Sequence, residues 1–149
     1  MTETSGSADS LRAPTSPLMV MILNTRALEA KLEKQLKEMG LSLRRLGLLG
    51  HVRAEPGISF SSLARRAGIR VQSLQPIIEG MLSDGLVQAV GGVGQGRAAV
   101  LELTSRGQDA LKEAYEVIAA LDRETFADGE WKELGAALTH LGEAWLVKR

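Results

Sequence analysis

The stretch VQSLQPIIEGMLSDGLV, residues 71–87, decides the fold of this chain. Its apolar residues recur at the spacing of a helix, and Gly85 is placed to end that helix in a turn. Pro76 and Gly80 lie in its interior, and it contains no lysine or arginine. A proline deep in a helix loses a hydrogen bond and clashes with the carbonyl four residues back, which costs about 3 kcal/mol. A helix forms here only if that cost is reduced or offset.

A late start of the helix would reduce the cost. If Ser73 is the N-cap, Pro76 lies in the first turn, where backbone N–H groups have no partner within the helix. Gln75 keeps some strain, because the residue before a proline disfavours the helical region. Gly80 costs about 1 kcal/mol relative to alanine. We expect a neighbouring backbone or DNA to approach this glycine closely, and we expect a soft helix.

Three helices are expected before this stretch. Apolar residues at every third or fourth position predict a long amphipathic helix over residues 18–39, which Gly40 ends. Ser42 and Ser59 are placed to cap two shorter helices, LRRLGLLGHVRA (43–54) and FSSLARRA (60–67). The second of these and the opening stretch form two consecutive short helices joined by a tight turn.

A hairpin and two more helices follow the stretch. The segments LVQAV (86–90) and RAAVLEL (97–103) have the character of strands, and a glycine-rich loop joins them. Thr104 is placed to cap a helix that runs to about Leu121. The last helix begins near Asp128 and carries an apolar stripe made of Trp131, Leu134, Leu138, Leu141 and Trp145.

This order predicts a winged helix-turn-helix: a mainly α fold with a small β-hairpin wing and amphipathic helices at both ends. The outer helices are more apolar than a core of this size requires, so we expect them to pair with the same helices of a second chain. An intramolecular bundle is the alternative. Residues 1–17 are rich in Ser, Thr and Pro and predict a disordered tail. We assign 18–41 and 105–149 to a helical dimerisation region and 42–104 to the winged helix-turn-helix.

The composition argues against several functions. The chain has no cysteine, and its two histidines, His51 and His140, are too far apart in sequence to suggest a metal site. We read His51 as a structural residue and the tryptophans as packing residues, in preference to ligand or cofactor contacts. No arrangement of nucleophile and base emerges, so we expect no enzyme, cofactor or metal. No apolar run approaches about 20 residues, and the first residues do not resemble a signal peptide, so we expect a cytoplasmic protein.

Three segments, taken together, resemble the MarR family of bacterial transcription regulators. They are GLSLRRLGLLGHV (40–52), PGISFSSLARRAGIRVQSLQPIIEGMLSDGLV (56–87) and GRAAVLELTSRG (96–107). The resemblance implies a symmetric homodimer in which the first helix and the last two helices interlock and each subunit presents a winged helix-turn-helix. It also implies double-stranded DNA as a partner and, as in many members, a small phenolic or lipophilic effector.

The resemblance places the helix of the opening stretch in the major groove of DNA. Its polar positions that would meet base edges and phosphates are Gln72, Ser73 and Gln75; glutamine can pair with adenine and serine with a base edge or a phosphate. Further candidates for DNA contact are Ser61, Ser62 and Arg70. Arg97 of the wing is the best single candidate. Pro76 and Ala89 stand where relatives often carry a cation, and Gln95 replaces the usual aspartate of the wing.

The charge predicts modest DNA affinity. The whole chain has 18 basic and 18 acidic residues. Between residues 59 and 106 there are five arginines and three acidic residues, a net charge of about +2 (five minus three) per subunit. Fewer cations mean fewer released counterions, hence weaker non-specific binding and a shallow salt dependence. Arg65 and Arg66 are either a solvated face or phosphate contacts.

We therefore expect a dimeric DNA-binding transcription regulator, a repressor of a pseudo-palindromic operator that a small lipophilic or phenolic ligand releases. The alternative is a winged-helix dimer with weak or lost DNA binding that acts as a ligand-binding or protein-interaction module. The glycine-rich loop is read as a wing and not as a phosphate cradle, because a strand follows it and no Gly-Lys-Ser/Thr is present. The sequence does not point to effector-binding residues.

Overall fold

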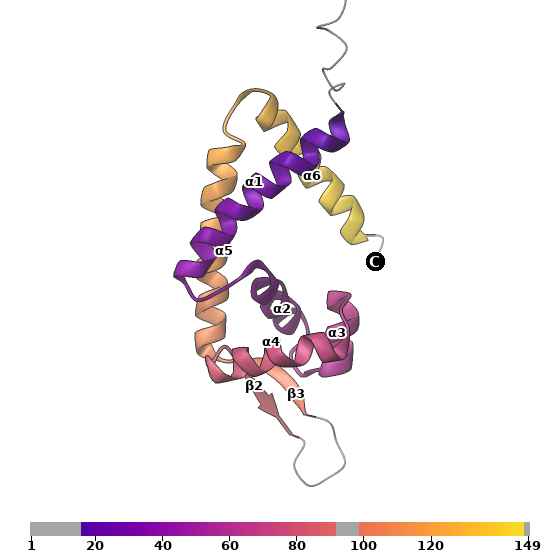
Figure 1. Cartoon of the computed structure of the whole chain (residues 1–149), viewed down its shortest axis with the longest axis vertical. Helices are drawn as coiled ribbons and strands as arrows, with labels where there is room; N and C mark the ends of the chain where they lie inside the picture. The colour runs from indigo at the N-terminus through magenta and orange to yellow at the C-terminus, as the bar shows by residue number, and fades with distance from the viewer. Residues whose placement is uncertain (1–15, 92–98, 148–149) are drawn as a thin grey trace, which may run out of the picture. The chain divides into compact units, whose positions relative to one another are not determined.

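The computed structural model describes residues 16–91 and 99–147, apart from the side chains of residues 145–147. The described residues form six helices and three strands (Figure 1). In chain order these are α1 (Pro17–Glu38), α2 (Leu43–Ala54), β1 (Ile58–Ser59), α3 (Phe60–Ala67), α4 (Val71–Ser83), β2 (Val87–Val90), β3 (Val100–Leu103), α5 (Ser105–Thr125) and α6 (Gly129–Val147). The chain divides into two compact units, Met1–Lys31 and Leu32–Arg149, and the boundary lies within α1.

Three of the predicted caps, Ser42, Ser59 and Thr104, are confirmed, and each begins its helix in the same way. The hydroxyl oxygen of Ser42 accepts from the Arg45 N–H at 3.2 Å, and that of Ser59 accepts from the Ser62 N–H at 3.2 Å. Thr104 does the same at the start of α5. Each bond satisfies one of the donors that a helix leaves free at its N-terminus, an effect worth about 1 kcal/mol. Local sequence therefore fixes where these helices begin.

The sheet has one strand more than the sequence predicts. The strand β1 has two residues and pairs antiparallel with β3, with Ile58 opposite Leu101. The strand β3 also pairs antiparallel with β2, so the order in the sheet is β1-β3-β2. A two-residue strand is too short to show alternation in the sequence, which explains why β1 was missed. The helix α5 also runs four residues beyond the predicted end, to Thr125.

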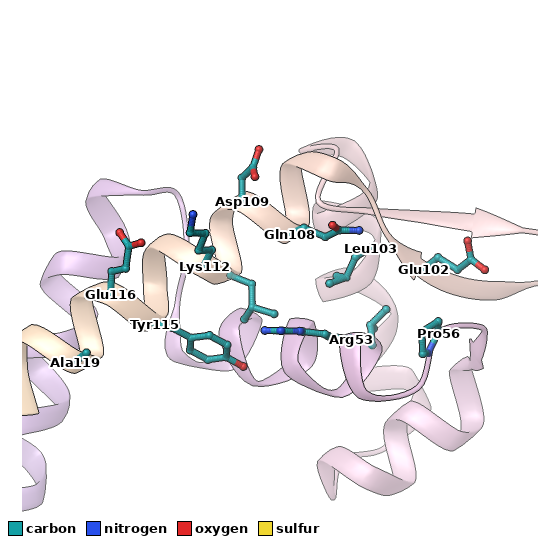
Figure 2. Close-up of a pocket in the computed structure, with 12 residues that line it drawn as sticks. Arg53, Pro56, Glu102, Leu103, Gln108, Asp109, Lys112, Tyr115, Glu116 and Ala119 are labelled. Atoms are coloured by element: carbon teal, nitrogen blue, oxygen red, sulfur yellow. The ribbon is translucent and has the colours of Figure 1, made fainter.

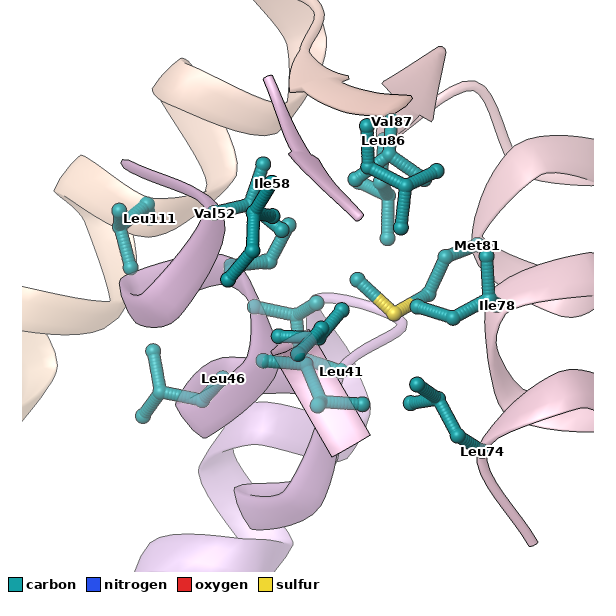
Figure 3. Packing of buried hydrophobic residues seen from close by; sticks show 14 of the residues in the cluster. Leu41, Leu46, Val52, Ile58, Leu74, Ile78, Met81, Leu86, Val87 and Leu111 are labelled. Atoms are coloured by element: carbon teal, nitrogen blue, oxygen red, sulfur yellow. The ribbon is translucent and has the colours of Figure 1, made fainter. Parts of the chain in front are cut away.

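The core lies in the unit that begins at Leu32 and is built of aliphatic side chains from every surrounding element (Figure 3). Its fully buried members include Leu36, Leu49, Leu63, Leu74, Ile78, Met81, Leu101 and Leu111. Burying each such side chain stabilises the fold by about 1.5–3 kcal/mol. Among the described residues no polar or charged residue is buried. The core therefore holds α4 by apolar packing on one face only.

The junction between α4, the hairpin and α5 explains the motif LT-x-x-G. The Thr104 hydroxyl accepts from the Gly107 N–H at 3.0 Å and donates to the Gly85 carbonyl, so one side chain joins the end of α4 to the start of α5. A Cβ at position 107 would overlap the carbonyl oxygen of Leu86. The glycine leaves room for α5 to begin against the turn that follows α4, and the threonine stabilises that start.

The outer helices leave apolar side chains exposed. In the unit of residues 1–31, the exposed large apolar side chains of α1 are Leu18, Met19, Val20, Met21 and Leu23. In the other unit, α6 exposes Trp131, Leu134, Leu138 and Leu141, which recur every three or four residues. At the start of α6, Gly135 leaves room for the ring of Phe126. No helix of the described part of the chain is long and apolar enough to cross a membrane. The predicted tail lies outside the described residues, apart from its last two positions.

Candidate nucleic-acid interface

The helix α4 begins earlier than the sequence predicts. Its regular turns start at Val71 with Arg70 as the N-cap, so the expectation that Ser73 caps the helix is wrong. The Arg70 carbonyl accepts from the N–H groups of Ser73 and Leu74, each at 3.0 Å. Pro76 is thus the sixth residue of the helix. The carbonyl that loses its partner is that of Gln72, which is exposed, so water can take the place of the missing donor.

Packing explains why the helix tolerates the proline. Leu74, Ile78 and Met81 lie on one face of α4 and are fully buried. Their burial contributes several kcal/mol, more than the cost of about 3 kcal/mol for the proline. Tertiary contacts thus outweigh the local preference for a late start.

The N-terminal end of α4 presents the residues that are predicted to contact DNA. Gln72, Ser73 and Gln75 are all exposed and lie in the first turns of the helix. The amide nitrogen of Gln75 donates to Glu79 at 3.1 Å, a bond one turn along the same helix. The other side of the Gln75 amide is an acceptor, so this residue must turn away from Glu79 to offer both groups to a base. The structure places all three polar residues at the exposed N-terminal end of the helix.

Serines at the start of α3 form a second polar group. The hydroxyl oxygen of Ser59 lies 3.3 Å from that of Ser61 and donates to that of Ser62 at 3.0 Å. Ser62 is half-buried and also accepts from Arg65 at 3.3 Å, whereas Ser61 is exposed. Of the two predicted serines, Ser61 is therefore the more accessible, whereas the Ser62 hydroxyl is engaged by Ser59 and Arg65.

The arginines differ in how they are engaged. Arg66 forms an ion pair of 3.2 Å with Glu55, which offsets part of its charge. Arg65 donates to Ser62, and Arg70 is exposed at the start of α4, where its side chain makes no capping bond. The wing residue Arg97 lies outside the described residues. Arg70 is therefore the exposed cation adjacent to the polar face of α4.

The close neighbour of Gly80 within the chain is a side chain, not the backbone that the sequence led us to expect. A Cβ at position 80 would stand 2.7 Å from the Nη2 atom of Arg45, which belongs to α2. The Nη1 atom of Arg45 donates to Asp84 at 2.6 Å and to the Gly40 carbonyl at 3.4 Å. Arg45 is a residue that the sequence analysis missed. Its partner Asp84 is 39 positions away, and no local pattern reveals such a distant contact.

A hollow of about 840 Å³ lies away from α4, between the end of α2, β3 and α5 (Figure 2). Its lining combines the ring of Tyr115 with two cations, Arg53 and Lys112, and with the carboxylates of Glu102, Asp109 and Glu116. The Arg53 guanidinium stands 6.0 Å from the centre of the Tyr115 ring. The surface is thus amphipathic and can contact a small molecule through an aromatic face and a cation.

The described part of the chain contains no group of three or more His, Asp or Glu side chains that could hold a metal ion. The site is instead a helix-turn-helix, α3 followed by α4, backed by a small sheet whose strands β2 and β3 form the base of a wing (Figure 1). An exposed polar face on the second helix of such a motif is the arrangement with which these proteins read DNA. The fold and the site define a winged helix-turn-helix protein.

Known proteins agree with this class. No family model matches the chain. The HTH-type transcriptional repressor Rv2887 of Mycobacterium tuberculosis is 28% identical over 116 residues, which cover 77% of this chain and 84% of the repressor. Two solved structures of M. tuberculosis proteins are also similar. The transcriptional regulator MosR, in complex with DNA, is 26% identical, with a TM-score of 0.60 over 90% of this chain and 98% of that one.

The second structure is the MarR family protein Rv2887 in complex with salicylic acid. It is 24% identical, with a TM-score of 0.66 over 88% of this chain and 98% of that one, and it shows the same fold. Together these comparisons confirm the resemblance to the MarR family that the sequence motifs indicate. The chain has the winged helix-turn-helix fold of these regulators and resembles the MarR family.

Proposed function

We propose that this protein is a dimeric transcription regulator that binds duplex DNA through α4 and the wing, and that it is not an enzyme. The observation that carries the proposal is the division of α4 into two faces. Leu74, Ile78 and Met81 are buried, whereas Gln72, Ser73 and Gln75 are exposed at its N-terminal end. A helix that presents amides and hydroxyls from a rigid core can bond base edges without rearrangement of the backbone.

The relatives support a repressor. The curated relative is named a transcriptional repressor, and MosR was solved with DNA. We propose that this chain likewise represses transcription, and that it acts in the cytoplasm, on a pseudo-palindromic operator. The predicted alternative, a dimer that has lost DNA binding, is not favoured by these relatives.

A dimer supplies the symmetry that such an operator needs. The stripe of exposed apolar residues on α6 offers one surface for a second chain, and the exposed apolar residues of α1 offer another. In a two-fold dimer, two copies of α4 enter successive major grooves about one helical turn, roughly 34 Å, apart. The predicted division into a dimerisation region and a DNA-binding region stands as part of this proposal.

The effector proposed for this regulator is a small phenolic or lipophilic molecule. The relative Rv2887 was solved with salicylic acid. In this chain the hollow beside Tyr115 combines an aromatic ring with the cations Arg53 and Lys112, and it contacts both α2 and α5. A ligand that binds there better in one arrangement of these helices than in another shifts the population away from the DNA-binding form.

Salicylate tests the effector proposal directly. Millimolar salicylate is expected to weaken operator binding, measured by fluorescence anisotropy, and to raise the melting temperature of the free protein. Lys112→Gln should reduce both effects because it removes a cation from the hollow, whereas Lys132→Gln, an equal charge change on α6, should leave them unchanged. Equal responses of the two variants would exclude the hollow as the salicylate site.

Arg97→Ala and Gln72→Ala test DNA binding by the wing and by α4. An arginine that reaches the minor groove contributes to affinity on any sequence, so Arg97→Ala should weaken binding to operator and scrambled duplexes alike and lower the salt slope by about one. Gln72→Ala should weaken operator binding alone, by about 1–3 kcal/mol. Gln108→Ala, an exposed glutamine on α5, is the matched control. Unchanged affinity in both variants would contradict DNA binding through these elements.

A further inference from the structure

One arginine of α2 joins the ends of two other helices. The Nη1 atom of Arg45 donates to the carboxylate of Asp84, the C-cap of α4, at 2.6 Å. It also donates, at 3.4 Å, to the carbonyl of Gly40, in the turn that follows α1. The side chain of Arg45 is 24% exposed, which is low for an arginine on a small domain. A single guanidinium thus contacts the end of the recognition helix and the turn between α1 and α2.

The glycine of α4 makes this arrangement possible. A Cβ at position 80 would stand 2.7 Å from Nη2 and 3.8 Å from Cζ of Arg45, which is too close for the guanidinium to stay where it is. Glycine in the interior of a helix is unfavourable relative to alanine. The chain therefore carries a weaker helix former at a position where any side chain would displace Arg45.

Electrostatics also favour a specific role for this contact. Arg45 is the third residue of α2, where a cation interacts unfavourably with the dipole of its own helix. The guanidinium is directed instead toward the C-terminal end of α4 and the turn after α1, where backbone carbonyls concentrate negative charge. The Asp84 carboxylate completes the pair. The interactions that retain Arg45 at this position are thus those with other elements.

We propose that Arg45 is a positioning residue for DNA recognition, which fixes the orientation of α4 by holding its C-terminal end against α2 and the turn after α1. This proposal rests on the proposed function, since it assumes that α4 reads DNA. Arg45 does not itself contact the DNA-facing residues. Gln72 and Asp84 are twelve positions apart, which is roughly 18 Å along a helix. Arg45 therefore affects DNA recognition by fixing the orientation of α4.

The variant Gly80→Ala separates positioning from stability. The added Cβ displaces the guanidinium, which is the flexible end of a side chain, and leaves the core unchanged. Alanine favours the helix, so the urea midpoint of unfolding should stay constant or rise. Operator affinity should nevertheless fall by about tenfold, as expected for the loss of one coupled contact. In the background of Arg45→Gln, Gly80→Ala should have no further effect on operator affinity.

Charge changes of opposite sign separate positioning from a simple field effect. Arg45→Gln removes a cation and Asp84→Asn removes an anion, so a general attraction to phosphate predicts weaker binding for the first and tighter binding for the second. Positioning predicts that both variants bind the operator about tenfold more weakly while binding to a scrambled duplex changes little. Arg44→Gln, an equal charge change at the exposed neighbouring residue of α2, is the matched control and should lose less than twofold.

Two measurements decide the outcome, anisotropy on both duplexes and hydrogen exchange of the Asp84 and Gly85 amides in the free protein. The Asp84 and Gly85 amides bond to the last turn of α4, at the Gly80 and Leu82 carbonyls. Weaker operator binding by Gly80→Ala and Asp84→Asn, with faster exchange, supports the positioning role. Wild-type affinity of Gly80→Ala, or tighter binding by Asp84→Asn, overturns it. If the wild-type protein does not discriminate between the duplexes, the proposed function fails, and with it the role of Arg45 in DNA recognition. Exchange in Arg45→Gln then distinguishes the two failures: faster exchange shows that Arg45 still holds the end of α4, and unchanged exchange shows that it does not.

Discussion

The helices α4 and α6 have similar apolar patterns and opposite surroundings. In α4 the apolar residues Leu74, Ile78 and Met81 are fully buried within one chain. In α6 the stripe that contains Leu134, Leu138 and Leu141 is 43% to 61% exposed. An amphipathic helix has to bury its apolar face against something. The difference indicates that the recognition helix is held by the single chain, whereas α6 has an apolar face that a second chain can cover.

The largest effect is expected in the core. Ile78→Ala removes a fully buried side chain from α4 and should lower the free energy of unfolding by about 2–5 kcal/mol. Because the contacts lie within one chain, we expect the same loss at every protein concentration. Urea unfolding at two concentrations a hundredfold apart would measure it. Ile77→Ala, on the half-buried neighbouring residue, should cost clearly less. If the loss of unfolding free energy grew on dilution, the contacts of Ile78 would depend on a second chain, and α4 would not differ from α6 in this respect.

A charge on the exposed stripe tests the other half of the comparison. Leu138→Glu should leave the helical content unchanged and raise the dimer dissociation constant by about tenfold or more, because a carboxylate would be buried without a partner. Sedimentation equilibrium would report the shift. Thr139→Glu adds the same charge one residue further along, off the apolar stripe, and serves as the control. Equal behaviour of the two variants would show that the stripe is not the interface.

A smaller effect is expected at Thr104, where the turn after α4 meets the start of α5. Thr104→Val removes the cap of α5 and the bond to Gly85, and should lower the free energy of unfolding by about 1 kcal/mol. Thr139→Val removes a hydroxyl that only bonds back to the Gly135 carbonyl of its own exposed helix, and should change stability by less than about 0.5 kcal/mol. Thermal unfolding of the pair would compare them, and equal losses would contradict the role assigned to Thr104.

The sequence predicted the structure correctly where the interactions that form it are between residues close together in the chain. Ser42, Ser59 and Thr104 cap helices because each needs only an N–H group three residues along the chain, and a single sequence contains that information. The alternation of the hairpin strands likewise predicted β2 and β3. The polar residues of α4 that match the MarR motifs, Gln72, Ser73 and Gln75, are exposed, and their contact with DNA stays a prediction.

The predictions were wrong where contacts between residues far apart in the sequence determine the structure. Pro76 predicted a late start of α4, but burial of Leu74 and Ile78 keeps the first turns regular. The strand β1 forms only because β3, some forty residues later, offers it a partner. Gly80 indicated a close neighbour correctly, yet nothing in the sequence could show that this neighbour is Arg45. Contacts across such separations depend on the folded chain and leave no periodic pattern.

The most direct test of DNA recognition by α4 is fluorescence anisotropy of a labelled duplex from upstream of the protein's own gene, titrated at several salt concentrations beside a scrambled duplex. We predict tighter binding to the upstream duplex at every concentration, with the shallow salt dependence of a DNA-binding region that has a net charge of about +2 per subunit. Equal and weak binding to both duplexes, lost at physiological salt, would contradict the claim that the polar face of α4 reads bases.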